Sequence, residues 1–336
     1  MEGFSAQRSA EEQATFLSKS LLTSGFVSSG GNTSSSHSVG GVRSLVALSL
    51  AAAGVQAAQI NTVQSEEAKA EHILSELPTE PVTLYQYMNC PFCNKVRAFF
   101  DYNNIPYSIV EVNPLTKSEI KGMKKNKNGK LKVPIIGLPS GREDQMVESD
   151  AIIDEFQRLL DENPGKASKP WFGSSKSKQT SDKGVQDMQD LRKWVNNKFV
   201  HVITVNIYRN PEEALETFQY LTTNGNFSPL MKESIKYSGA GIMYMVSQYS
   251  IKKKRNLPGD ERTHLYEQAE KWVKDLEGND FHGGSKPDLA DLSVFGVIRA
   301  VEGFQTFKDM MSKNTQMSEW WSRMEKEVGG SAQVVT

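Results

Sequence analysis

Cysteine is scarce in this chain, because Cys90 and Cys93 are the only two among 336 residues. Two cysteines cannot build a disulfide framework or a four-cysteine metal site. The five histidines are scattered without the short spacing of a metal motif, so a two-cysteine, two-histidine zinc site could arise only by long-range assembly. We therefore expect no metal ion held directly by the protein.

The chain also lacks an excess of charge of either sign. Its 39 basic and 40 acidic residues give a formal net charge of −1. Nucleic-acid-binding proteins usually carry a basic surface, so no nucleic-acid partner is expected. The lysine-rich stretches at 117–132 and 252–255 are interpreted as solvated loops or helix ends.

Residues 1–70 have few of the residues that build a core. They are rich in Ser, Gly and Ala, and the polar run at 28–36 could not be buried. The segment at about 45–60 is mostly apolar, but it is shorter than the roughly 20 residues that a membrane-spanning helix needs. We interpret 1–70 as a low-complexity leader, and its apolar segment as a membrane anchor, a processed targeting segment or a short helix in a disordered leader.

The Cys90-Pro91-Phe92-Cys93 segment lies where the hydrophobic period changes from two to 3.6 residues. A strand is predicted before it, over 82–87, and an amphipathic helix after it. Cys90 is thus expected at a helix N-terminus, where free amides and the helix dipole favour a thiolate. Pro91 suits the first turn of that helix. The pattern predicts that Cys90 is the reactive thiol.

Residues 81–162 follow the element order of a thioredoxin-like α/β layer. The helix after Cys93 should end near 103–104 and lead into a strand at 107–112, parallel to the first through a right-handed crossover. A short exposed helix is predicted within 116–127. A strand from 133, a turn at 137–142 and a return strand at 145–147 precede a helix over 150–160.

Two further motifs could bind a peptide-like ligand. A cis bond between Val133 and Pro134 would turn the Val133 backbone outward, towards an extended peptide. Ser149, after Glu148, is predicted to cap the last helix, whose first amides could receive a carboxylate. Together they suit a small tripeptide thiol. An edge-strand proline and an N-cap serine without any ligand are the structural alternatives.

Residues 185–328 are predicted to be helical. Apolar residues from Leu191 to Ile203 form one stripe. A second helix is expected over 230–251, with Gly239 and Gly241 allowing close packing, and a third begins at Asp288, which with Asp291 approximates a capping box. His201 lies on the first stripe, where it could be a core histidine or a ligand.

The order Cys-Pro-Phe-Cys, Val-Pro and Glu-Ser-Asp resembles the N-terminal domains of glutathione transferases and glutaredoxins. The flanks at 84–87, 95–99 and 110–114, together with 206–209 and 283–297, resemble the membrane-associated prostaglandin E synthase 2 family, and the resemblance covers about 81–325. It implies an α/β plus all-α protein, with a thioredoxin-like domain at 81–162 followed by a glutathione-transferase-like helical domain at 185–328.

The resemblance also implies an activity, the thiol-dependent isomerisation of prostaglandin H2, a lipid endoperoxide, to prostaglandin E2. It implies bound glutathione, a haem whose iron takes the glutathione sulfur, a homodimer, and a membrane location at the Golgi and endoplasmic reticulum or an organelle, with a processed soluble form as an alternative. Thr204 replaces a serine of the family and Glu148 an aspartate. The implied catalytic residues are Cys90, Tyr87 as a hydroxyl donor to the thiolate, and Cys93, and the implied binding residues are Phe92, Val133, Pro134, Glu148, Ser149, His201 and Thr204.

Other functions stay open at this point. In a glutaredoxin-like thiol-disulfide oxidoreductase, Cys90 would attack a disulfide and Cys93 would resolve it. A general glutathione transferase is a second alternative. The third is a protein that binds haem or glutathione without turnover.

Overall fold

The computed structural model describes residues 74 and 76–334, except for 114–115, 140, 164–181 and 225–228. The predicted leader at 1–70 and its apolar segment lie outside these residues. Ile73–Thr336 forms one compact unit. The division of this unit into domains at 81–162 and 185–328 therefore stays a prediction.

A four-stranded mixed sheet confirms the thioredoxin-like layer. Its order is β2-β1-β3-β4, with β1 at Val82–Gln86, β2 at Tyr107–Glu111, β3 at Ile135–Leu138 and β4 at Gly141–Val147. β1 runs parallel to β2 and antiparallel to β3, and β3 runs antiparallel to β4. Alternate residues of β1 are buried, as its period of two predicted.

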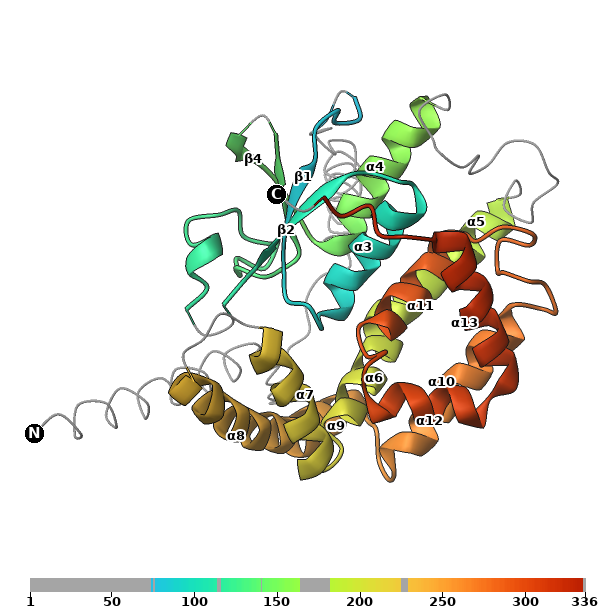
Figure 1. Ribbon diagram of the computed structural model, residues 1–336. Helices are drawn as coiled ribbons and strands as arrows, with labels where there is room; N and C mark the ends of the chain where they lie inside the picture. The colour runs from blue at the N-terminus through green and yellow to red at the C-terminus, as the bar shows by residue number, and fades with distance from the viewer. Residues whose placement is uncertain are drawn as a thin grey trace, which may run out of the picture. The chain divides into compact units, whose positions relative to one another are not determined.

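Helices α3 (Pro91–Tyr102) and α4 (Ser149–Glu162) pack beside this sheet (Figure 1). Aromatic side chains join them, since the ring centroids of Phe100 and Phe156 lie 4.9 Å apart, edge to face. The short helix predicted within 116–127 is instead a single 3₁₀ turn, Ser118–Ile120. Left-handed backbone at Lys117 (φ 50°) and Gly122 (φ 84°) ends the helical geometry on both sides.

The second half is helical, as predicted, and two π-helical segments interrupt its helices. Among the described residues, the longest continuous α-helix has 18 residues. Each π segment places an extra residue in a turn and so rotates the helix that follows. The elements are α5 (Asp182–Trp194), the first π segment (Val195–Phe199), α6 (Val200–Ile207), α7 (Pro211–Asn224), α8 (Pro229–Val246), the second π segment (Ser247–Ile251), α9 (Lys252–Arg255), α10 (Glu261–Asp275), α11 (Leu289–Arg299), α12 (Gln305–Lys313) and α13 (Thr315–Val328).

Helix α11 packs directly on α3, the helix that begins at the Cys90 turn (Figure 1). A Cβ atom added to Gly296 would lie 2.6 Å from the Lys95 Cα, so only glycine allows the two backbones to approach this closely. The predicted capping box at Asp288 and Asp291 is confirmed, with both reciprocal hydrogen bonds present. The capped helix is thus fixed against the helix that carries the thiol.

The predicted close packing of the 230–251 helix is confirmed at one of its two glycines. At Gly239 an added Cβ would lie 2.3 Å from the Phe218 ring. At Gly241 the same atom would meet nothing within 4 Å, so this glycine is not needed for packing.

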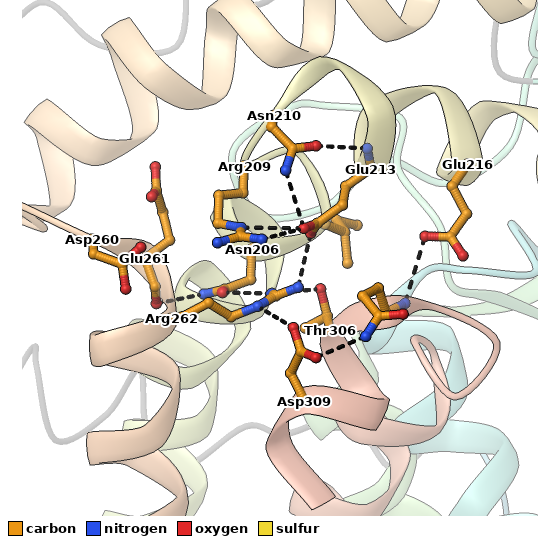
Figure 2. A network of polar contacts seen from close by, with 12 residues as sticks. Asn206, Arg209, Asn210, Glu213, Glu216, Asp260, Glu261, Arg262, Thr306 and Asp309 are labelled. Carbon is orange, nitrogen blue, oxygen red and sulfur yellow. Dashed lines mark hydrogen bonds and ion pairs between the residues drawn. The ribbon is translucent and has the colours of Figure 1, made fainter. Parts of the chain in front are cut away.

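Arg262 on α10 is the centre of a polar network that joins four helices (Figure 2). Its guanidinium donates to Asn206 Oδ1 on α6 at 2.8 Å and to Glu213 Oε2 on α7 at 2.9 Å. It also donates to Thr306 and Asp309 on α12, at 2.9 and 2.8 Å. A buried charge with four acceptors fixes the relative register of these helices.

The structure contradicts the predicted membrane location. Among the helices that it describes, none is both long enough and apolar enough to cross a membrane. The longest, α8, carries Lys232, Glu233 and Lys236 within its span. The prediction depended on the segment at 45–60, which lies outside the described residues.

Candidate functional site

The Cys90 turn connects the end of β1 to the start of α3. Cys90 is the N-cap residue of α3, and Pro91 occupies the first helical position. The Cys90 amide donates to the Tyr87 carbonyl at 2.9 Å, and the Asn94 amide donates to the Cys90 carbonyl at 3.0 Å. Cys90 is partly accessible, whereas Cys93 is buried. The helix N-terminus predicted at Cys90 is therefore confirmed.

The two thiols differ in acidity. A side-chain hydrogen bond from Cys93 lowers the pKa of Cys90, burial acts in the opposite direction, and the backbone amides of Cys93 and Phe92 add to the lowering. Burial, followed by the interaction with Cys90, raises the pKa of Cys93. Cys90 is thus the better thiolate, and Cys93 is its hydrogen-bond donor.

Glu111 lies beside this turn, and the sequence analysis did not single it out. Its carboxylate accepts from the Met88 amide at 2.6 Å and from Gln86 Nε2 at 3.2 Å. Burial raises the pKa of Glu111 despite these hydrogen bonds. Its negative charge in turn opposes ionisation of Cys90. The parallel register, which pairs Gln86 with Glu111, is the signal that could have revealed it.

Tyr87 packs with Val133 against a small cluster formed by Val112, Ile120, Met123 and Ile135. Burial, and then the negative charge of Cys90, raises the pKa of the Tyr87 hydroxyl, which stays protonated at neutral pH. The Tyr87 backbone forms a hydrogen bond with the Cys93 sulfur. Donation from the Tyr87 hydroxyl to the thiolate stays a prediction.

Phe92 follows Pro91 and lies partly buried against the main core. The Lys95 ammonium stands 6.0 Å from its ring centroid. This places an aromatic ring at the Cys90 turn, and the binding role of Phe92 stays a prediction.

The Val133–Pro134 bond is cis and directly precedes β3. Glu148 has left-handed backbone, with φ at 70°, and precedes the first residue of α4, Ser149. The N-cap position therefore belongs to Glu148 and not to Ser149, which corrects the prediction by one residue. The Glu148 carboxylate lies 3.7 Å from the Lys127 ammonium, and Ser149 is buried.

A buried lysine links the Cys90 helix to the start of α4 and to the first π segment. Lys95 Nζ donates to Asp150 Oδ1 at 2.5 Å and to Asn196 Oδ1 at 2.7 Å. Asn196 also donates to Asp150, and Arg192 contacts Asp150 at 3.5 Å. Burial lowers the pKa of Lys95, and the charge of Asp150 opposes this effect. The sequence analysis assigned no role to these residues.

His201 and Thr204 lie together on α6. Burial, and then the charges of Arg255 and Lys254, lowers the pKa of His201 to about 4, so the ring is neutral at pH 7. The Thr204 hydroxyl donates to the Val200 carbonyl of the same helix at 2.7 Å. The interactions described for these two residues are with their own helix and with α9, not with the Cys90 turn.

Comparison with known proteins gives the class first. Residues 84–164 match the family model "Glutathione S-transferase, N-terminal domain". With the thioredoxin-like sheet and the helices that follow it, this match defines a glutathione-transferase-like protein. By structure, the chain aligns with Beta-etherase LigF from Sphingobium sp. strain SYK-6 over 74% of this chain and 98% of that one, with 14% identity and a TM-score of 0.49.

Relatives that match over about three quarters of their length show the family. Prostaglandin E synthase 2 of Danio rerio is 38% identical over 295 residues, and that of Mus musculus is 35% identical over 298. Each alignment covers 79% of this chain and 76% of the relative. The chain belongs to the prostaglandin E synthase 2 family. Glutaredoxin 1 of Rickettsia conorii is also similar, with 31% identity over 97 residues, which are 28% of this chain and 92% of that protein.

Proposed function

We propose that this protein isomerises prostaglandin H2 to prostaglandin E2 with Cys90 as the nucleophile. The observation that carries the proposal is the partly accessible Cys90 thiol at the N-terminus of α3, with a pKa lowered by Cys93. Family membership supports the choice of substrate.

The reaction would balance without an external oxidant or reductant. The Cys90 thiolate attacks the endoperoxide oxygen on the carbon that becomes the ketone, so an S–O bond forms and the O–O bond breaks. The released alkoxide takes up a proton and becomes the hydroxyl group. The carbon whose oxygen carries the sulfur then loses its proton to a base. This step forms the carbonyl, breaks the S–O bond and restores the thiolate.

Glutathione is the proposed co-ligand. The start of α4 offers free first-turn amides, which suit a carboxylate, and the Glu148 carboxylate beside them suits an amino group. Val133 lies just outside the ladder that begins at Ile135, where its backbone could pair with the peptide. Pro134 fixes the chain at this point, and Phe92 would line the apolar side.

Haem is a further proposal from the family resemblance. The basic side chains of Lys254 and Arg255, near His201, suit the carboxylates of a porphyrin, and Thr204 lies on the same helix. Haem would supply one-electron chemistry when bound. A homodimer likewise stays a prediction, which gel filtration of the full chain would test.

The test compares haem-free wild type with Cys90→Ser, incubated with prostaglandin H2 and glutathione. Prostaglandin E2 is quantified by mass spectrometry above the spontaneous yield. We expect an excess for wild type and only the background yield for Cys90→Ser. Equal yields from the two proteins would exclude the Cys90 mechanism.

A thiol-disulfide oxidoreductase is the second candidate, because Cys93 is hydrogen-bonded to Cys90 and could resolve a mixed disulfide. Reduction of hydroxyethyl disulfide by glutathione, coupled to glutathione reductase, measures this activity. Loss in Cys90→Ser together with background yields of prostaglandin E2 would favour this second function.

A further inference from the structure

A cavity of about 470 Å³ lies behind the Cys90 turn. Met88 and Asn89, the two residues directly before Cys90, form part of its wall. The opposite part comes from Arg299 at the end of α11 and from the turn that includes Glu302 and Phe304. The cavity therefore borders the turn that carries the proposed catalytic thiol, although neither Cys90 nor any other predicted site residue lines it.

Two residues of the cavity wall have buried hydrogen-bond donors without an acceptor in the described part of the chain. Arg299 donates to Asp101 Oδ2 at 2.8 Å, but its buried Nε has no hydrogen-bond partner in the described part of the chain. The buried Nδ2 of Asn89 is also unpaired there. Buried donors without acceptors are costly, and a ligand that supplies an acceptor would recover part of that cost after small side-chain movements.

Arg97 is the other arginine of the cavity, and it interacts through space with the negative charge of Glu111. It lies on α3 and lines the cavity. The hydrogen bonds that the structure gives it are both long, 3.5 Å to the Tyr107 hydroxyl and 3.5 Å to Asn94 Oδ1. By contrast, Arg299 is already paired with Asp101. Glu302, exposed at the rim, is the acidic residue of the lining.

These charges select the class of ligand. A guanidinium fork matches carboxylate and phosphate equally well in shape. Arg299 is paired with Asp101, and Glu111 partly offsets the charge of Arg97, so at most one positive charge is left in the cavity. This suits a single carboxylate better than a doubly charged phosphate. Met88 and Phe304 add apolar surface, as an alkyl chain requires.

We propose that this cavity is the carboxylate subsite for a fatty-acid-derived substrate, with Arg97 as the principal anchor and Arg299 and Asn89 as additional donors. It would hold the acid end of the lipid beside the turn that carries Cys90. The assignment deepens the proposed function and rests on it for the identity of the lipid.

The test measures binding, so it does not depend on turnover. Arachidonate, a fatty acid, and its methyl ester are titrated into the full chain by isothermal titration calorimetry. The variants are Arg97→Gln, Arg97→Lys and, as a matched control, Arg323→Gln, which removes an arginine on α13 outside the cavity lining. We expect Arg97→Gln to weaken arachidonate binding about tenfold, the low end for a hydrogen bond to a charged group. Arg97→Lys should restore part of the loss, Arg323→Gln should bind as wild type does, and the ester should bind all four proteins alike.

Equal affinity of wild type for the acid and the ester would overturn the subsite, and this comparison needs no variant to fold. So would unchanged binding in Arg97→Gln, absence of binding by either lipid, or displacement of arachidonate by inorganic phosphate. Arg97-dependent binding without prostaglandin E2 formation would refute the proposed function and leave the subsite standing. Cys90-dependent isomerisation with no preference for the acid would do the reverse.

Discussion

Replacement of Cys93 by alanine tests the physical basis of Cys90 reactivity. The hydrogen bond from the Cys93 side chain is the largest effect that lowers the pKa of Cys90, while burial and Glu111 act in the opposite direction. Alanine removes this donor and leaves the backbone amides of α3 in place. Cys93 is fully buried, and the change to alanine removes only its sulfur. We therefore expect less thiolate at Cys90 at neutral pH.

The size of the effect follows from the type of hydrogen bond. A hydrogen bond to a charged group contributes about 1.5–3 kcal/mol, so its loss should decrease the thiolate-to-thiol ratio about 10- to 100-fold. A more basic thiolate is also a better nucleophile, with a Brønsted coefficient of about 0.4–0.5, and this offsets part of the decrease. The net alkylation rate at pH 7 should then fall about three- to tenfold.

The assay follows the rate of Cys90 alkylation by iodoacetamide between pH 5 and 10, with mass spectrometry to identify the modified residue. Cys93→Ser is the matched control, because its hydroxyl keeps a donor at the same position. We expect the midpoint of the pH profile to rise in Cys93→Ala and to stay closer to wild type in Cys93→Ser. An unchanged profile in Cys93→Ala would show that the amides at the start of α3 alone set the acidity, and the reasoning would be refuted.

Two further predictions concern stability. Arg262→Met should lower the free energy of unfolding by about 3 kcal/mol, because Glu213 loses its buried arginine partner and keeps only the half-buried Arg209. Lys193→Met, at an exposed pair with Asp190, should cost less than about 1 kcal/mol, and equal losses in urea unfolding would contradict this reasoning. His201 has a folded pKa of about 4, below its ordinary value of 6.5. The stability that the neutral His201 ring contributes should therefore be fully present above about pH 6.5 and should be lost as the pH drops towards 4. After allowance for partial exposure, His201→Gln should remove about 1–2 kcal/mol of this pH dependence. If the free energy of unfolding of the two proteins changed with pH in parallel, this prediction would be refuted.

Local patterns were sufficient to predict much of the thioredoxin-like half. The change of hydrophobic period at Cys90 predicted both the end of β1 and the start of α3. The capping box at Asp288 was also readable, because its partners lie three residues apart. These features depend on interactions within one turn or one crossover, which the order of residues specifies.

Long-range contacts were not predictable in the same way. Lys95 lies on the buried side of α3, where a charge is usually avoided, and only its partners Asp150 and Asn196 make that position tolerable. Those partners are 55 and 101 residues away in the chain. The helix predicted within 116–127 failed for another reason, since the left-handed backbone at a lysine has no clear sequence signal.

The opposing effects on Cys90 suggest how the site is arranged. Its thiolate is stabilised by donors within three residues, namely Cys93 and the backbone amides of the first turn, and destabilised by burial and by Glu111. The ionised form therefore depends on the turn itself and does not require a basic side chain nearby. Arg97, at the cavity behind the turn, is therefore not needed to stabilise the thiolate, and under the proposal it would bind the substrate instead. Acidity and lipid recognition would thus reside in different residues, so that Cys93→Ala should change the pH profile of alkylation and Arg97→Gln should change only the affinity for the acid.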